Sequence, residues 1–128
     1  MAQPADLLYS KEHEWVRIDG GVATVGITDY AQSSLGDIVY VELPRVGAAI
    51  SQFGNTGVIE SVKAVSDIFT PIGGEVVETN AALEGDPALV NREPFAGGWL
   101  FRVKMSDPSE KNNLLSAASY DALVAEES

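Results

Sequence analysis

The chain has 128 residues, of which 45% are hydrophobic and 21% are charged, and its formal net charge at pH 7 is -11. This balance is typical of a soluble globular protein of one domain, and no run of apolar residues is long enough for a membrane helix. The negative charge repels phosphate backbones and anionic lipids, so we expect neither nucleic-acid nor membrane binding.

The first third of the chain predicts a hairpin, a short helix and a further strand. Residues 1–6 lack the basic and apolar segments of a signal or transit peptide, so we expect none. Thr28 can cap the helix at its start, and Gly36 can end it. The predicted strands are Leu7–Asp19, Val22–Ile27 and Ile38–Leu43, and the predicted helix is Asp29–Leu35.

After a turn-rich segment, 45–54, the stretch Gly57–Thr70 is symmetric in residue type about the bond between Lys63 and Ala64. A two-residue loop at that bond would make each mirrored pair a directly opposed cross-strand pair, with Lys63 at the tip. The mirrored pairs are Val62 with Val65, Ser61 with Ser66, Glu60 with Asp67, Ile59 with Ile68, and Val58 with Phe69.

Two details set this hairpin apart from an ordinary strand pair with a solvated lysine in its turn, which is the simpler interpretation. Lys-Ala lacks the Asn-Gly or Asp-Gly chemistry that two-residue turns favour. Opposed Glu60 and Asp67, at about 6 Å, would repel by roughly 0.7 kcal/mol in water and about 3 kcal/mol at an effective dielectric constant of 20. A role other than stability could explain these acids.

The last part of the chain predicts two more strands and a helical tail. Asp107 and Pro108 are suited to start a helix, and Ser116 can cap a second one. The predicted segments are the strand Glu75–Glu78, an irregular connection Asn80–Asn91 with at most a turn of helix, the loop Pro94–Gly98 and the strand Trp99–Met105. The sum is a single domain, 1–128, mainly β. Its β core, about 7–105, would form a barrel or sandwich on which a helical tail, about 107–126, packs.

Enzymatic chemistry has few candidate residues. His13 is the only histidine and there is no cysteine, so we expect no metal site, no disulfide and a reducing compartment. No nucleophile elbow, P-loop or dinucleotide fingerprint is present. The displayed Lys63 remains. A lysine amine is protonated at neutral pH and is a poor nucleophile unaided, but it suits acylation by another enzyme, so that the hairpin would carry a long arm.

Several motifs carry a resemblance to a known family. The segment around Lys63, ESVKAVSD, is similar to the lipoyl-attachment motif. Four further segments match in the same order: SKEHEWVR at Ser10–Arg17, GITDYAQSSLGDIVYVELP at Gly26–Pro44, LVN at Leu89–Asn91, and GGW at Gly97–Trp99. Over nearly its whole length the chain resembles the H proteins of the glycine cleavage system.

The resemblance implies a barrel-sandwich hybrid fold with a short internal helix and C-terminal helices packed on the sheets, and lipoate in amide linkage on Lys63. The lipoyl arm would receive an aminomethyl group from a pyridoxal-phosphate-dependent glycine decarboxylase, with release of CO2. A tetrahydrofolate-dependent aminomethyltransferase would then take the methylene group, and dihydrolipoamide dehydrogenase would reoxidise the dithiol.

The same resemblance implies a carrier rather than an enzyme, a shuttling substrate of its partner enzymes. A lipoate ligase or a lipoyl/octanoyl transferase would attach the arm. We expect a monomer in the bacterial cytoplasm, or in the mitochondrial matrix if the chain is a mature eukaryotic form.

This role suggests a function for the acidic residues near the hairpin. A protonated amine at the end of the arm could be held against carboxylates in a surface cleft. Glu14 and Asp67 are our choices for this arm-parking cleft, with Glu60 as the second choice. The chain departs from many relatives in having Tyr30 and Ser34 where histidine is common.

Rival interpretations exist within the same fold class. Biotinyl carriers set their lysine between methionines, and lipoyl domains of 2-oxoacid dehydrogenases occur on larger chains without the C-terminal helices. A lipoyl relay that donates lipoate to other carriers, without turnover of glycine, is the alternative from a different functional class.

Overall fold

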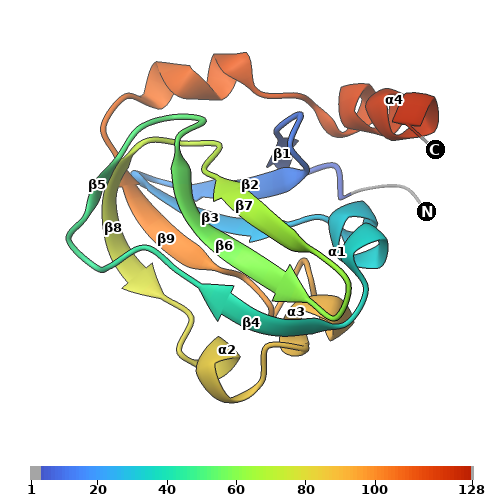
Figure 1. Ribbon diagram of the computed structural model, residues 1–128. Helices are drawn as coiled ribbons and strands as arrows, with labels where there is room; N and C mark the ends of the chain where they lie inside the picture. The colour runs from blue at the N-terminus through green and yellow to red at the C-terminus, as the bar shows by residue number, and fades with distance from the viewer. Residues whose placement is uncertain (1–3, 128) are drawn as a thin grey trace.

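The computed structural model describes residues 4–127 and shows two antiparallel sheets that face each other (Figure 1). The expectation that the chain has no signal peptide was drawn from residues 1–6. Of these, residues 1–3 lie outside the described residues. Within residues 4–127 the larger sheet has six strands in the order β1 (Leu8–Tyr9), β2 (Glu14–Asp19), β3 (Val22–Ile27), β9 (Phe101–Met105), β8 (Gly74–Thr79) and β5 (Ala49–Ile50). The smaller has three, in the order β4 (Ile38–Glu42), β6 (Asn55–Ser61) and β7 (Val65–Phe69).

Short helices connect and cover the sheets: α1 (Asp29–Leu35), α2 (Ala82–Gly85), α3 (Leu89–Arg92), the 3-10 helix η1 (Pro108–Asn113) and α4 (Ala117–Glu127). This is the predicted mainly β barrel-sandwich hybrid with a helical tail. In the described part of the chain, no helix has the length and apolar character needed to cross a membrane.

The main core lies between the two sheets. Ile59 and Ile68 of the β6–β7 hairpin belong to the same buried cluster as Val25, Phe101 and Val103 of the larger sheet. Burying one aliphatic side chain of this size contributes about 1.5–3 kcal/mol. The base of the hairpin is therefore fixed to the core, while its tip extends beyond it.

The helix α1 forms with the predicted bounds and caps. The hydroxyl of Thr28 accepts the Ala31 N–H at 3.2 Å. Gly36 ends the helix with a φ of 82°, a conformation that glycine adopts at little cost, and its N–H donates to the Gln32 carbonyl. Local sequence signals suffice here because both caps act within one turn of the helix.

The connection Asn80–Asn91 contains more helix than predicted, because α2 and α3 are separate turns. Asn80 accepts the Ala82 N–H at 3.2 Å and so caps the first turn. Pro87 stands just before the second turn, where its missing N–H is not needed, and its carbonyl accepts the Val90 N–H. Strand β5 was also missed, because two residues in a turn-rich segment carry too little pattern.

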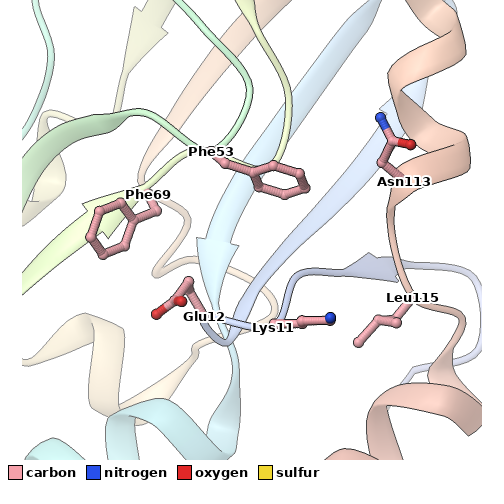
Figure 2. A pocket seen from close by; sticks show the side chains of 6 residues that line it. All are labelled: Lys11, Glu12, Phe53, Phe69, Asn113 and Leu115. Carbon is pink, nitrogen blue, oxygen red and sulfur yellow. The ribbon is translucent and has the colours of Figure 1, made fainter.

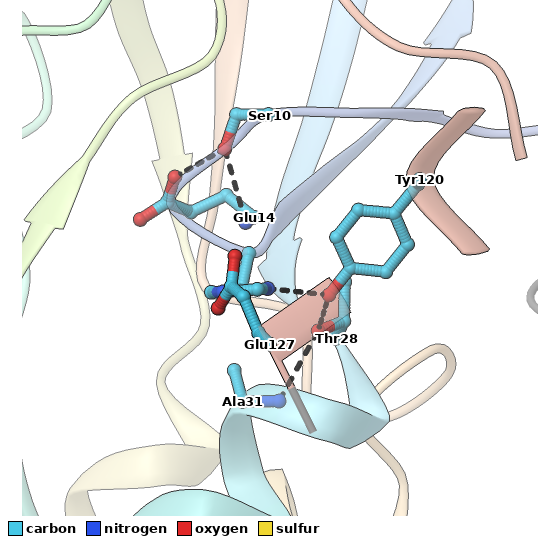
Figure 3. Close-up of polar contacts among 7 residues, drawn as sticks. Ser10, Glu14, Thr28, Ala31, Tyr120 and Glu127 are labelled. Atoms are coloured by element: carbon cyan, nitrogen blue, oxygen red, sulfur yellow. Dashed lines mark hydrogen bonds and ion pairs between the residues drawn. The ribbon is translucent and has the colours of Figure 1, made fainter. Parts of the chain in front are cut away.

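The C-terminal helix α4 is fastened to the larger sheet through Tyr120, which is fully buried. Its ring stacks on Tyr9 with centroids 4.7 Å apart. Its hydroxyl lies 2.6 Å from the Thr28 hydroxyl and 2.8 Å from Nδ1 of His13 (Figure 3). Burial raises the pKa of Tyr120 to about 12, so the phenol keeps its proton at physiological pH. The tail is thus joined to the cap of α1.

Replacing Tyr120 by phenylalanine keeps the ring and removes the shared hydroxyl. Because the buried Thr28 hydroxyl then loses a partner, we expect Tyr120→Phe to lower the free energy of unfolding by about 1–2 kcal/mol in urea denaturation. Tyr40→Phe is the control: Tyr40 is 48% exposed, and its loss of a hydroxyl should change stability by less than about 0.5 kcal/mol. Equal stability of both variants would contradict the fastening role of Tyr120.

Candidate functional site

Lys63 is exposed at the tip of the β6–β7 hairpin, in a turn that Ser61 closes. The Ser61 N–H donates to the Ala64 carbonyl at 2.8 Å. The Ser61 hydroxyl accepts the N–H groups of Lys63 and Ala64 at 3.3 and 3.0 Å. A serine side chain thus supplies the local hydrogen bonds that an Asn-Gly turn would otherwise provide.

The predicted register of this hairpin is wrong by two residues. The central residues of the turn are Val62 and Lys63, so Glu60 lies opposite Val65, and Asp67 lies opposite Val58. The expected opposition of Glu60 and Asp67 is therefore absent, and so is the strong repulsion calculated for it. A shift of two leaves every side chain on its predicted face, because the strand period is two.

The same shift corrects the other mirrored pairs. Ile59 lies opposite Ser66, and Ile68 opposite Gly57, so these two isoleucines are diagonal neighbours on one buried face. Val62 and Val65 do not form a packed pair: their side chains are 69% and 66% exposed on either side of Lys63. The rigid stem of the hairpin therefore consists of its isoleucines, and the valines belong to the exposed tip.

Glu14 is buried behind the hairpin, at the start of β2, with 2% of its surface exposed. Its Oε1 accepts the Ser10 hydroxyl at 2.6 Å, and its Oε2 accepts the Phe69 N–H at 3.2 Å. Figure 3 shows Ser10 between the carboxylate and the backbone nitrogen of Glu14. Burial raises the pKa of Glu14 to about 8, although these hydrogen bonds act in the opposite direction. Near neutral pH the carboxyl group is therefore mostly protonated.

A hollow of 280 Å³ lies between the hairpin and α1. Ser66 of β7 lines it on one side, and Tyr30, Ser34 and Leu35 of α1 on the other. Glu12, His13, Ala31 and Glu127 complete its wall. Glu127 is held in place by a hydrogen bond, in which its Oε1 lies 3.0 Å from Nε2 of His13.

A second hollow, of 380 Å³, lies beyond Glu12 near the far end of β7. Figure 2 shows Phe53 and Phe69 on one side, with Glu12, Lys11 and Leu115 below and beside them. Its remaining lining residue is Asn113. Because Glu12 lines both hollows, they lie on either side of this one carboxylate. We name the two together the β7 groove.

The sequence-predicted acids occupy different positions relative to this groove. Glu14 contacts β7 through the Phe69 backbone but lines neither hollow. Asp67 is exposed on β7, two residues before Phe69, and also lines neither hollow. Glu12 and Glu127 are the carboxylates in the walls, and sequence reasoning missed both. A signal for the groove was present at Tyr30 and Ser34, which had been singled out as departures from family histidines.

A family model described as "Glycine cleavage H-protein" matches residues 7–127. The chain belongs to the glycine cleavage H-protein family. Curated members include the glycine cleavage system H protein of Alcanivorax borkumensis, 53% identical over 124 residues and 97% of both chains. That of Escherichia coli O7:K1 is 56% identical over 125 residues, again 97% of both.

A solved member has the same fold. The crystal structure of a glycine cleavage system H protein from Mycobacterium marinum superposes with a TM-score of 0.89 at 39% identity, covering 96% of this chain and 99% of the other. Membership of the H-protein family confirms the predicted role as a lipoyl carrier of the glycine cleavage system. The biotinyl-carrier and lipoyl-relay interpretations are not favoured.

The buried Glu14 should make stability depend on pH. In the unfolded chain a glutamate ionises near pH 4.5, whereas the folded chain holds this proton to about pH 8. The unfolded state therefore binds fewer protons between these values, and stability falls as pH rises through this window. We expect Glu14→Gln to remove this loss. The free energy of unfolding of Glu14→Gln, relative to that of the parent, should therefore rise by about a few kcal/mol between pH 5 and pH 9.

Thermal unfolding of both proteins across this pH range measures the effect. Glu84→Gln is the matched control, because Glu84 is exposed on α2 and its loss should leave the stability difference from the parent nearly unchanged across this pH window. A pH-independent difference between Glu14→Gln and the parent would contradict the burial argument.

Proposed function

We propose that Lys63 is the residue that carries lipoate, and that the β7 groove receives the arm between encounters with partner enzymes. The observation that supports this most strongly is the placement of Lys63. It stands in an exposed turn that is closed by hydrogen bonds to Ser61, on a hairpin whose base is buried in the core. A partner enzyme can therefore reach the amine without opening the fold.

The residues present fit an acyl chain in amide linkage to Lys63. The groove starts beside Ser66, three residues from Lys63, and continues to Phe69. At about 3.3 Å per residue, Ser66 lies roughly 10 Å and Phe69 roughly 20 Å along the chain from Lys63. Its apolar side chains, among them Leu35, Phe53 and Phe69, suit an aliphatic chain. The bound lipoyl group would supply a redox-active disulfide that accepts the aminomethyl group, chemistry that no protein side chain here provides.

The chain's own residues would bind, orient and shield the arm. Glu12 and Glu127 place carboxylates in the groove walls, where they would attract a cationic end of the arm. Glu14, protonated while no cation is near, would ionise when one approaches the Phe69 end of β7. Asp67, exposed beside the tip, stays a candidate for this contact together with Glu14.

The partners that we propose are those of the glycine cleavage system: glycine decarboxylase, the aminomethyltransferase and dihydrolipoamide dehydrogenase, with a lipoate ligase or transferase for attachment. The chain would serve them as a monomeric carrier rather than an enzyme, in the cytoplasm of a bacterium. Its net charge of -11 favours fast encounter with partners that present basic surfaces.

Attachment can be tested by intact mass. After co-expression with a lipoate ligase, we expect the parent protein to gain one lipoyl increment and Lys63→Arg to gain none, because arginine cannot form the amide. Lys104→Arg, an exposed lysine on β9, should be modified like the parent. A lipoyl increment that persists in Lys63→Arg would refute the assignment of Lys63.

The role of the acids can be tested by timing loss of the aminomethyl group from the loaded protein. We expect Glu14→Gln and Asp67→Asn to shorten its lifetime, each roughly three- to tenfold, the range of one charge-assisted contact. Glu12→Gln should act in the same direction. Glu84→Gln, on α2, is the control and should leave the lifetime unchanged. Unaltered lifetimes in Glu14→Gln, Asp67→Asn and Glu12→Gln would exclude arm parking by these carboxylates.

A further inference from the structure

The turn that carries Lys63 rests on the short segment between α1 and β4. The Val62 N–H donates to the Asp37 carbonyl at 3.0 Å, immediately before Lys63 in the chain. The Lys63 side chain passes over Gly36, where a Cβ would lie 3.5 Å from Cε of the lysine. Ile38, at the start of β4, pairs with Ser61. The segment Gly36–Ile38, which we name the tip platform, therefore supports the turn from below.

A single amide side chain holds this platform. Asn91, in α3, accepts the Ile38 N–H at 2.9 Å through its Oδ1. Its Nδ2 donates to the Gly36 carbonyl at 2.9 Å and to Oε1 of Gln32 at 2.9 Å. These bonds engage the amide on both sides of Asp37 and also reach the last turn of α1. Asn91 is 53 positions from Ile38 in the sequence, so this contact is made by the tertiary fold and not by a local turn.

We propose that Asn91 is a positioning residue for Lys63, acting through the tip platform. The inference rests on the proposed attachment at Lys63. Asn91 fixes the backbone before and after Asp37, and the Asp37 carbonyl then holds the Val62 N–H. Loss of the amide would free the Gly36 carbonyl and the Ile38 N–H. The platform would loosen, and the turn would present Lys63 in many orientations in place of one.

The chemistry of the position is specific to an amide. The platform offers one N–H and one carbonyl to the same side chain, and asparagine has both an acceptor and a donor. Aspartate has the same size, but it lacks the donor and would set a negative oxygen against the Gly36 carbonyl. Alanine would leave both backbone groups without this partner.

The chain contains a matched control in Asn80. Asn80 also makes three hydrogen bonds, in its case all to backbone: its Nδ2 donates to the carbonyls of Gly97 and Trp99, both at 2.8 Å, and its Oδ1 accepts the Ala82 N–H. Removing it should reduce stability by a similar amount. These hydrogen bonds do not involve Gly36–Ile38, so Asn80 separates a general loss of stability from a loss of positioning.

The experiment uses the unmodified full-length chain and a lipoate ligase, at a temperature where every variant is folded by circular dichroism. We expect Asn91→Ala and Asn91→Asp to lower kcat/KM for acylation of the chain by about five- to tenfold, mainly through KM. Amide hydrogen exchange at Val62, measured by NMR, should accelerate about tenfold in both variants. Asn80→Ala should change neither quantity.

The proposal would be overturned if both Asn91 variants kept the kcat/KM and the Val62 exchange rate of the parent. It would also be overturned if Asn80→Ala lowered kcat/KM as much as the Asn91 variants do. The two proposals fail separately. Acylation that persists in Lys63→Arg would remove the attachment site, whereas the exchange of Val62 reports on the platform without any acylation.

Discussion

The burial of Ile59 and Ile68 between the two sheets is the constraint on which the presentation of Lys63 depends. These side chains join the hairpin to Phe101 and Val103 of the larger sheet, so the base of β6 and β7 cannot move independently of the core. Because successive side chains of a strand point to opposite faces, the residues that alternate with them reach the surface. A fixed base with an exposed tip is what a carrier of a long arm requires.

The tip has its own support, separate from the core. Ser61 closes the turn from within, and the Asp37 carbonyl holds it from outside through Val62. Ser61 supplies hydrogen bonds to Lys63 and Ala64, and Asp37 supplies one, each contributing about 0.5–1.5 kcal/mol, so the tip is ordered but not locked. This order is compatible with the proposed role of Lys63 as a residue that partner enzymes reach.

Which features the sequence predicted follows from the range of the interactions involved. The cap residues Thr28 and Gly36 act locally, so α1 was predicted with correct bounds. The faces of the hairpin were also correct, because a strand period of two survives a shift of two residues. The register was not, because residue-type symmetry about Lys63 outweighed a local signal, the serine at position 61.

Long-range contacts explain the remaining differences. The burial of Glu14 depends on the backbone of Phe69, 55 positions away, and a single sequence does not reveal such a partner. The β7 groove likewise joins Phe53, Leu115 and Glu127 from separate parts of the chain. The family motifs pointed to Lys63 as the proposed attachment residue, but the groove walls were found only in three dimensions.

The most direct test of the central claim is the transfer of label from glycine to the lipoylated chain. Incubation with glycine decarboxylase and glycine carrying carbon-13 at its methylene position, followed by intact mass, reports whether the arm on Lys63 accepts the group. A labelled aminomethyl increment on the lipoylated parent, absent from Lys63→Arg after the same treatment with ligase, is the predicted result. A lipoylated parent without the increment, or a Lys63→Arg protein that carries it, would contradict the account.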